Sequence, residues 1–328
     1  MDEPVYKPKY VSPTSLHLWE SDREAFFIKY LSGMPQPDNQ QTLAMSVGSA
    51  FDAFVKSRLY SDLKLGDDPQ YGLDALLKEQ VDAEIMDDAR EAGKYVFECY
   101  EACGAYSSLR GDLATSDETP RFEFTLRGQV EGVPLIGKPD CWYSRGGVQV
   151  VLDWKVNGYA SKSAVSPKKL YRWCRDTWTA DRAKPTRGGA GPHKQFVPMD
   201  FHGHAIGAHW LDDVDKTWAD QLTIYSWMLG IPVGDDNIVT CIDQIACKPA
   251  EPKPLLRVAQ HRCRISPFWQ HSMVGRLHDC WNTITSGHIF TELTREESDS
   301  RCEVLIMQAQ QMDDDPLWAL VNQKRYRG

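Results

Sequence analysis

The chain has 328 residues, of which 42% are hydrophobic and 11% aromatic, enough for a packed core in one elaborated domain or one domain with an added lobe. No apolar run approaches the roughly 20 residues that cross a bilayer, and residues 1–13 lack the basic and then apolar order of a secretory signal. The nine cysteines follow no framework spacing, which favours reduced thiols. We therefore expect a cytoplasmic protein without a membrane partner.

The net charge of −9 argues against a polyanionic partner, but the charge is unevenly distributed. Residues 156–194 contain nine Lys and Arg against two acids, a local charge of +7, so the rest of the chain carries −9 − 7 = −16. A basic strip on an acidic body is typical of a protein that holds phosphates at one place only.

The first 115 residues are predicted to be helical. Ser12 followed by Pro13 is typical of a helix start, and Gly33 is expected to end that helix. Apolar residues then recur at helical spacing over residues 41–60 and 72–106. We expect this N-terminal region, residues 1–115, to pack on a core that follows it.

The pattern changes to strands at Pro120. Alternating apolar residues predict an antiparallel meander of strands at 121–127, 133–142 and 148–155, joined by short Gly-containing turns. A helix is expected at 215–229, two further strands within 237–265, and a long helix from Ser266 to about residue 287. The sequence predicts an α/β fold, with a central mixed sheet flanked by helices in a core domain at 116–295 and a helical tail at 296–328.

Three residues of the meander carry the chemistry. Asp153 and Lys155 alternate with Trp154, so on a strand both project from one face, and Asp140 lies close enough on the preceding strand to join them. Two carboxylates and an ammonium suit a hard cation such as Mg²⁺ or Mn²⁺, which keeps waters for a phosphate oxygen and a nucleophile. The alternative is an exposed ion pair, but the apolar strand 148–152 that leads into Asp153 argues for an inner strand end.

Further pieces occur in a fixed order around these three residues. They are Ser12–Gly33, Gly48-Ser-Ala-Phe-Asp52, Glu123, Gly137-Lys-Pro-Asp140, Asp153-Trp-Lys155 and Gln221-Leu-Thr-Ile-Tyr225. Together, over residues 12–290, they resemble the RecB-like branch of the PD-(D/E)XK nuclease superfamily, which includes phage and CRISPR-associated exonucleases.

The resemblance implies a restriction-endonuclease-like core and Mg²⁺- or Mn²⁺-dependent hydrolysis of DNA, as an exonuclease or end-processing enzyme. It implies that Asp140, Asp153 and the backbone carbonyl of Trp154 bind the metal while Lys155 assists the water. Gln221 and Tyr225 would hold the acids or the substrate. The setting it implies is recombination, repair or phage DNA metabolism in a prokaryotic or phage-infected cell, with DNA ends or single strands, and a possible recombination or repair protein, as partners.

Two departures from the family pattern leave the number of metal ions open. Asp52 stands where the family has a histidine, and it is either a further metal ligand or a surface acid. Asp-x-Lys stands where many members have Glu-x-Lys. The CRISPR-associated relatives often carry an iron–sulfur cluster, but Cys263, Cys280 and Cys302 are too dispersed for one, so we expect none.

Other functions fit parts of this pattern. One is a module that binds DNA without cutting it, or a subunit active only within a larger complex; the complete acid–acid–lysine set argues against a dead site. Another is a site-specific endonuclease of the same superfamily. The sequence leaves the oligomeric state open.

The insertion at residues 156–215, which begins directly after Lys155, is predicted to clamp DNA. Its basic residues are interleaved with aromatic ones, a mixture that suits phosphate contacts and base stacking, although a solvated basic loop is the alternative. The predicted contact residues are Lys162, Lys168, Lys169, Arg172, Trp173, Arg175, Trp178, Arg182, Lys184, Arg187 and Lys194.

Neutralising Lys168, Lys169, Arg172 and Arg175 together tests this clamp. We expect weaker DNA binding and a shallower dependence of the affinity on salt, because fewer counterions are released from the phosphates. Binding titrations at several salt concentrations measure both, and an unchanged affinity would rule the clamp out.

Overall fold

The computed structural model describes residues 8–34, 41–102, 104–157, 172–174, 198–201, 204–207, 210–248 and 255–313. The chain forms two compact units. Unit 1 comprises Met1–Asn39, Leu126–Gly137 and Phe268–Gly328, and unit 2 comprises Gln40–Thr125 and Lys138–Pro267. No helix in the described ranges is long and apolar enough to cross a membrane.

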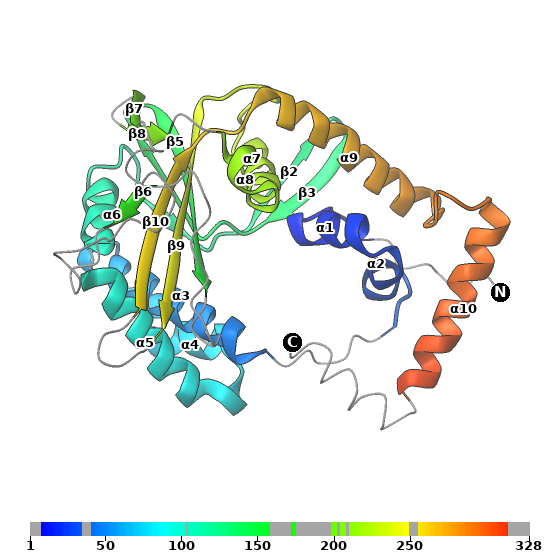
Figure 1. Cartoon of the computed structure of the whole chain (residues 1–328), viewed down its shortest axis with the longest axis horizontal. Coiled ribbons are helices and arrows are strands. Elements are labelled where there is room, and N and C mark those ends of the chain that lie inside the picture. The colour runs from blue at the N-terminus through cyan, green and yellow to red at the C-terminus, as the bar shows by residue number, and fades with distance from the viewer. Residues whose placement is uncertain are drawn as a thin grey trace, which may run out of the picture. The chain divides into compact units, whose positions relative to one another are not determined.

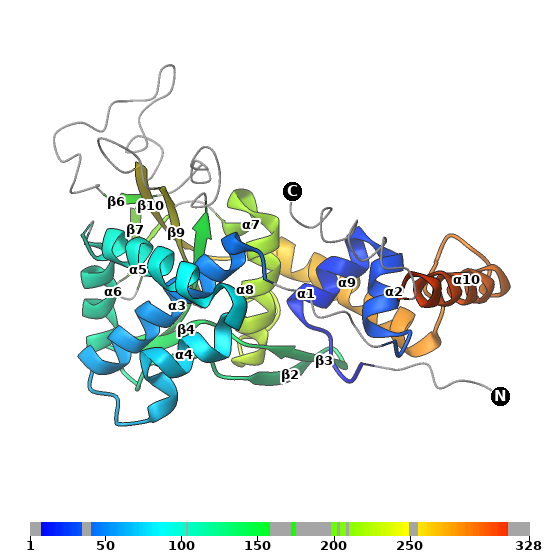
Figure 2. The same cartoon turned by 90° about the horizontal axis from the view of Figure 1, so that it is seen from below.

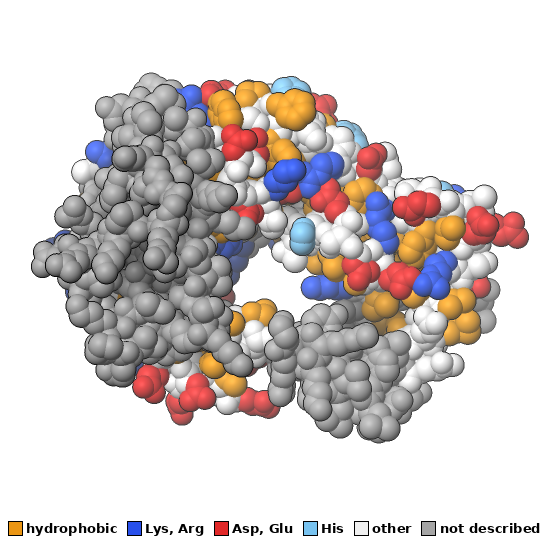
Figure 3. Space-filling model, in the orientation of Figure 1, with side chains coloured by type: hydrophobic (Ala, Val, Ile, Leu, Met, Phe, Trp, Pro, Cys, Tyr) orange, Lys and Arg blue, Asp and Glu red, His pale blue; other side chains and the backbone are white. Residues whose placement is uncertain are grey.

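Unit 1 combines helices from both ends of the chain with a β-hairpin. Its helices are α1 (Pro13–Ser21), α2 (Arg23–Tyr30), α9 (Pro267–Ser286) and α10 (Arg295–Asp313), and its hairpin is β2 (Leu126–Val130) with β3 (Val133–Gly137). Ser12 caps α1 as predicted, accepting a hydrogen bond from the Ser15 backbone. The predicted single helix breaks at Asp22, whose side chain caps α2. On the face shown in Figure 3, acidic and basic side chains are interspersed over α9 and α10.

Unit 2 is built on a six-stranded sheet in the described part of the chain. The strand order is β1 (Arg121–Phe122), β4 (Cys141–Arg145), β5 (Val148–Asn157), β9 (Ile238–Lys248), β10 (Leu255–Cys263) and β6 (Arg172–Cys174) (Figure 1). Strands β5 and β9 pair in parallel and the other neighbours pair antiparallel. The predicted α/β fold with a central mixed sheet is therefore confirmed.

Helices cover both faces of this sheet (Figures 1 and 2). On one face lie α3 (Leu43–Asp62), α4 (Leu73–Gln80), α5 (Met86–Ala102) and α6 (Ala105–Ala114), with the 3₁₀ turns Pro69–Tyr71 and Ala83–Ile85. On the other lie α7 (Leu211–Val214) and α8 (Lys216–Met228), and a small sheet pairs β7 (Pro198–Phe201) with β8 (His204–Gly207). Strand alternation divides β5 between the faces: Trp154 joins the core with Phe51 and Tyr100, while Asp153 is bonded to Gln221 of α8.

The predicted meander is wrong at two of its strands. The segment 133–142 is two strands, β3 in the hairpin of unit 1 and β4 in the sheet of unit 2, and the strand expected at 121–127 stops at Phe122. The backbone explains both interruptions. Glu123 has a positive φ of 47°, which ends β1, and Pro139 between β3 and β4 has no N–H for a strand ladder.

The predicted DNA clamp falls largely outside the described residues. Only Arg172 and Trp173 are placed, as backbone, in the edge strand β6 beside β10. The other nine predicted contact residues lie outside the described ranges, so the clamp stays a prediction.

The close packing of α3 on α5 gives a test of the fold. A Cβ added at Gly93 would lie 2.5 Å from the Ala50 Cβ and 2.8 Å from the backbone nitrogen of Phe51. We expect Gly93→Ala to lower the free energy of unfolding by about 1–3 kcal/mol, because α3 and α5 must move apart.

The matched control is Gly111→Ala in α6, where nothing lies within 4 Å of the added Cβ. This change should stabilise the protein slightly, by up to about 1 kcal/mol, through helix propensity alone. Urea unfolding measures both variants, and equal effects would contradict the packing described for Gly93.

Candidate functional site

Three acids come together where strands β1, β4 and β5 meet. In the sheet register Phe122 pairs with Cys141, and Cys141 pairs with Leu152. The next residue at the same end of the sheet is Glu123 after Phe122, Asp140 before Cys141 and Asp153 after Leu152. The Glu123 N–H donates to the Asp140 carbonyl at 3.2 Å. The register therefore aligns three carboxylates on neighbouring strands. The sequence analysis named all three, Asp140 and Asp153 as metal ligands and Glu123 as part of the motif order.

Asp153 is held by its own strand and by α8. Its Oδ2 lies 2.6 Å from the Lys155 Nζ, and its Oδ1 accepts a hydrogen bond from the Gln221 Nε2 at 2.9 Å. Lys155 also donates to the Gln221 Oε1, at 3.2 Å. One amide side chain therefore fixes both members of the acid–lysine pair.

Tyr225 lies one helical turn beyond Gln221 on the same face of α8. Its hydroxyl accepts from the Gln221 Nε2 at 3.2 Å and donates to the Lys138 carbonyl at 3.3 Å. The hydroxyl thus connects α8 to the segment that precedes Asp140. Five of the predicted site residues, Asp140, Asp153, Lys155, Gln221 and Tyr225, are brought to one place.

Asp140 stands between the strands rather than within one. Its Oδ2 accepts a hydrogen bond from the Trp154 N–H at 3.0 Å, beyond the last residue pair of β4 and β5. In an extended strand the N–H and C=O of one residue point to the same side, so the Trp154 carbonyl faces the side on which Asp140 lies. The three oxygen donors predicted to bind a metal, on Asp140, Asp153 and Trp154, therefore belong to adjoining backbone positions.

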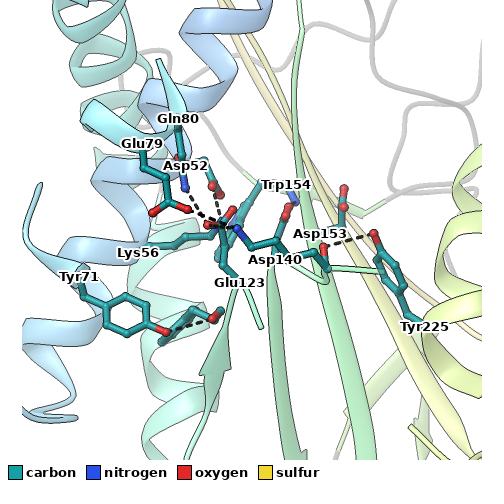
Figure 4. Close-up of polar contacts among 12 residues, drawn as sticks. Asp52, Lys56, Tyr71, Glu79, Gln80, Glu123, Asp140, Asp153, Trp154 and Tyr225 are labelled. Carbon is teal, nitrogen blue, oxygen red and sulfur yellow. Dashed lines mark hydrogen bonds and ion pairs between the residues drawn. The ribbon is translucent and has the colours of Figure 1, made fainter. Parts of the chain in front are cut away.

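Asp52 is not an exposed surface acid. It pairs with the ammonium of Lys56, one turn further along α3, and Lys56 also lies 2.8 Å from the Glu123 Oε1 (Figure 4). The Lys56 side chain is completely buried. Neither Lys56 nor the pairing of Glu123 was predicted, and the available signal was a lysine four residues after Asp52 on an apolar helix.

The charge of Asp140 affects the pKa of Asp153 on one side and the pKa of Asp52 on the other. Burial, and then the neighbouring Asp140, raises the pKa of Asp153 to about 7. Burial likewise raises the pKa of Asp52 to about 8, with Asp140 and Glu123 adding to the shift against the opposing effect of Lys56. Burial lowers the pKa of Lys155, but Asp153 and Asp140 more than reverse this and raise it overall. Burial is therefore the main cause of both raised carboxyl pKa values, and the charge of Asp140 adds to both.

Two carboxylate oxygens are buried without a hydrogen-bond donor in the described part of the chain. They are the Asp52 Oδ1 and the Asp153 Oδ2, and the latter keeps only its ion pair with Lys155. Buried carboxylates with raised pKa values are what a further cation would stabilise. Among the described residues, however, no three His, Cys, Asp or Glu side chains are arranged as a ready metal site.

Comparisons with known proteins leave the family open. No protein-family model matches the chain, and no curated protein matches it. Among solved structures, a protein from Eubacterium rectale named "Putative exonuclease" is 12% identical over 85% of this chain and 82% of its own, with a TM-score of 0.44. The protein SSO0001 is 12% identical over 82% and 84%, with a TM-score of 0.26, and VC1899 from Vibrio cholerae is 12% identical over 47% and 42%, with a TM-score of 0.16. At these scores none of the three assigns a family or an activity.

The raised carboxyl pKa values predict how the stability of the metal-free protein depends on pH. Asp52 and Asp153 hold protons in the folded state that they lose in the unfolded state above about pH 4, so the folded state binds more protons between about pH 4 and 8. The melting temperature in EDTA should therefore fall as the pH rises from about 5 to 8.

Asp153→Asn should flatten this decline, because the amide has no proton to lose. Asp74→Asn, which changes an exposed carboxylate of α4, is the matched control and should leave the profile unchanged. Thermal melts across this pH range measure all three proteins. A wild-type melting temperature that rises from pH 5 to 8 would contradict the buried, repelling acids.

Proposed function

We propose that this protein is a metal-dependent nuclease that hydrolyses phosphodiester bonds of DNA at the Asp140–Asp153–Lys155 site. The observation that carries the proposal is the arrangement around Asp153. Its two oxygens are bound by Lys155 and Gln221, and a second acid, Asp140, lies beside it. An ordinary exposed ion pair does not have a 2% exposed carboxylate and a helix amide bonded to both partners.

The residues fit a divalent cation of the Mg²⁺ type. Asp140, Asp153 and the Trp154 carbonyl offer oxygen ligands only, and among the described residues the Asp153 Oδ2 is engaged by the Lys155 ammonium alone. Mg²⁺ is commonly held by one or two carboxylates with waters in the other positions, so a third acid is not required. When bound, the cation would polarise a phosphoryl oxygen and lower the pKa of a water.

Lys155 supplies the positive charge that the chain itself brings to the reaction. Of its three N–H donors, one faces Asp153 and one faces Gln221, and the side chain is 30% exposed. A further donor is therefore available for the attacking water or for the negative charge that develops on the phosphate. Gln221 and Tyr225 act as positioning residues, since they fix Asp153, Lys155 and the backbone before Asp140.

The mode of action belongs to the same proposal. Cleavage from DNA ends, as an exonuclease or end-processing enzyme, is supported by the order of motifs in the sequence, and so is a role in recombination, repair or phage DNA metabolism. The basic segment after Lys155 would hold the strand. A covalently closed circular substrate separates the modes, because an exonuclease leaves it intact and an endonuclease opens it.

The deciding measurement is digestion of end-labelled linear DNA, single- and double-stranded, with Mg²⁺, Mn²⁺ or EDTA. We expect cutting by the wild type with metal only, and a loss on the order of 10²- to 10⁴-fold in Asp153→Ala and in Lys155→Met. The fate of the label gives the polarity.

Asp74→Ala serves as the matched control and should cut at the wild-type rate, because this exposed acid of α4 lies outside the site. If the wild type binds DNA but does not cut it under any metal condition, the isolated chain is a binding module or a subunit that needs its partner.

A further inference from the structure

Lys56 occupies an unusual position beside the candidate site. Its ammonium lies between the carboxylates of Asp52 and Glu123, with no exposed side-chain surface, and 5.9 Å from the centre of the Trp154 ring (Figure 4). An ammonium buried this completely is costly unless carboxylates compensate it. The chain supplies two, from α3 and from the end of β1.

The position of Glu123 is itself enforced. Its backbone adopts a left-handed φ of 47°, which non-glycine residues rarely do, and its Oε2 accepts from the Gln80 Nε2 at 2.9 Å and lies 3.1 Å from the Lys138 Nζ. Backbone strain of this kind persists where the surroundings determine it. The fold therefore directs Glu123 at Lys56 through contacts from two separate segments, at Gln80 and at Lys138.

The same ammonium acts on the candidate metal ligands. Besides Asp52 and Glu123, the charge of Asp140 raises the pKa of Lys56, against the opposing effect of burial, and Lys56 in turn stabilises the charge of Asp153. Lys56 therefore belongs to the same set of interacting charges as the acid–lysine pair on β5, although its side chain lies on the α3 side of the sheet.

The charges of this set balance for one divalent ion. Four carboxylates (Asp52, Glu123, Asp140 and Asp153) and two buried or half-buried ammonium groups (Lys56 and Lys155) leave a net charge of −4 + 2 = −2 when all are ionised. Lys138 and Glu79, both about half exposed, pair with each other and leave that sum unchanged.

We propose that Lys56 is a resident cation that takes the place of a second metal ion, so that the site binds a single divalent cation. The inference rests on the proposed function and decides the number of metal ions that the sequence left open. Asp52 then shares its Oδ2 with Lys56 and has only its Oδ1, which lacks a hydrogen-bond donor in the described residues, to turn toward the metal. Without Lys56 the net charge is −3 and Asp52 and Glu123 are released as ligands for a second ion.

The test counts Mn²⁺ ions bound per chain, by titration with free Mn²⁺ measured by electron paramagnetic resonance. We expect one ion for the full-length wild type, none for Asp153→Asn at the same concentrations, and two for Lys56→Met. Lys138→Met is the matched control, because it removes a half-exposed lysine whose charge solvent screens and leaves Asp52 and Glu123 paired with Lys56. It should still bind one ion.

Lys56→Met removes the ammonium that pairs with Asp52 and leaves Glu123 with Lys138 alone, so a thermal melt must first show that it folds. If it does not, Lys56→Met combined with Glu123→Gln restores the net charge of −2 and should bind one ion. Two ions bound to the wild type at sites lost in Asp153→Asn, no ion bound to the wild type, one ion bound to a folded Lys56→Met, or two bound to the double variant would each overturn the proposal.

The digestion assay, run in parallel, separates this inference from the function on which it rests. One bound Mn²⁺ without cleavage would leave Lys56 in its role and remove the nuclease. Cleavage with two bound ions would keep the nuclease and remove the role of Lys56.

Discussion

The structure of unit 2 depends on how the buried carboxylates at one end of its sheet are compensated by neighbouring ammonium groups and hydrogen-bond donors. Glu123, Asp140 and Asp153 are brought together by strand pairing alone, since each directly adjoins a paired residue of β1, β4 or β5. Like charges in a poorly solvated place raise one another's pKa values and destabilise the fold unless opposite charges are present. The surrounding helices supply that compensation.

Each face of the sheet compensates the acids in a different way. On the α8 face, Lys155 forms an ion pair with Asp153 and Gln221 donates a hydrogen bond to it, and the lysine stays partly exposed to solvent. On the α3 face, Lys56 is enclosed with Asp52 over the ring of Trp154. A strand turns successive side chains to opposite faces, so β5 presents its acid–lysine pair to one helix layer and its tryptophan to the other. A lysine that is partly exposed to solvent can contact a substrate, whereas a fully buried lysine can only compensate charge.

Packing away from the site determines how accurately these charges are placed. Helix α3 packs closely against α5 where Gly93 meets Ala50, two residues before Asp52 in α3. Tyr225 links α8 to the backbone at Lys138, two residues before Asp140. A shift of either helix would change the charge balance at Asp140, so the site and the core are not independent.

The sequence by itself determined the local features: the cap at Ser12, most helices and strands, the mixed sheet, and the candidate set of Asp140, Asp153 and Lys155. These local features depend on spacings of a few residues, and strand alternation and helix periodicity can be identified over such spacings in the sequence. Only the tertiary structure decided that residues 126–137 leave the sheet and group with both chain ends, and that Lys56 lies between Asp52 and Glu123. Glu123 is 67 positions from Lys56 in the chain. Contacts between such distant segments depend on how complete helices and strands pack, and short sequence spacings carry no information about that packing.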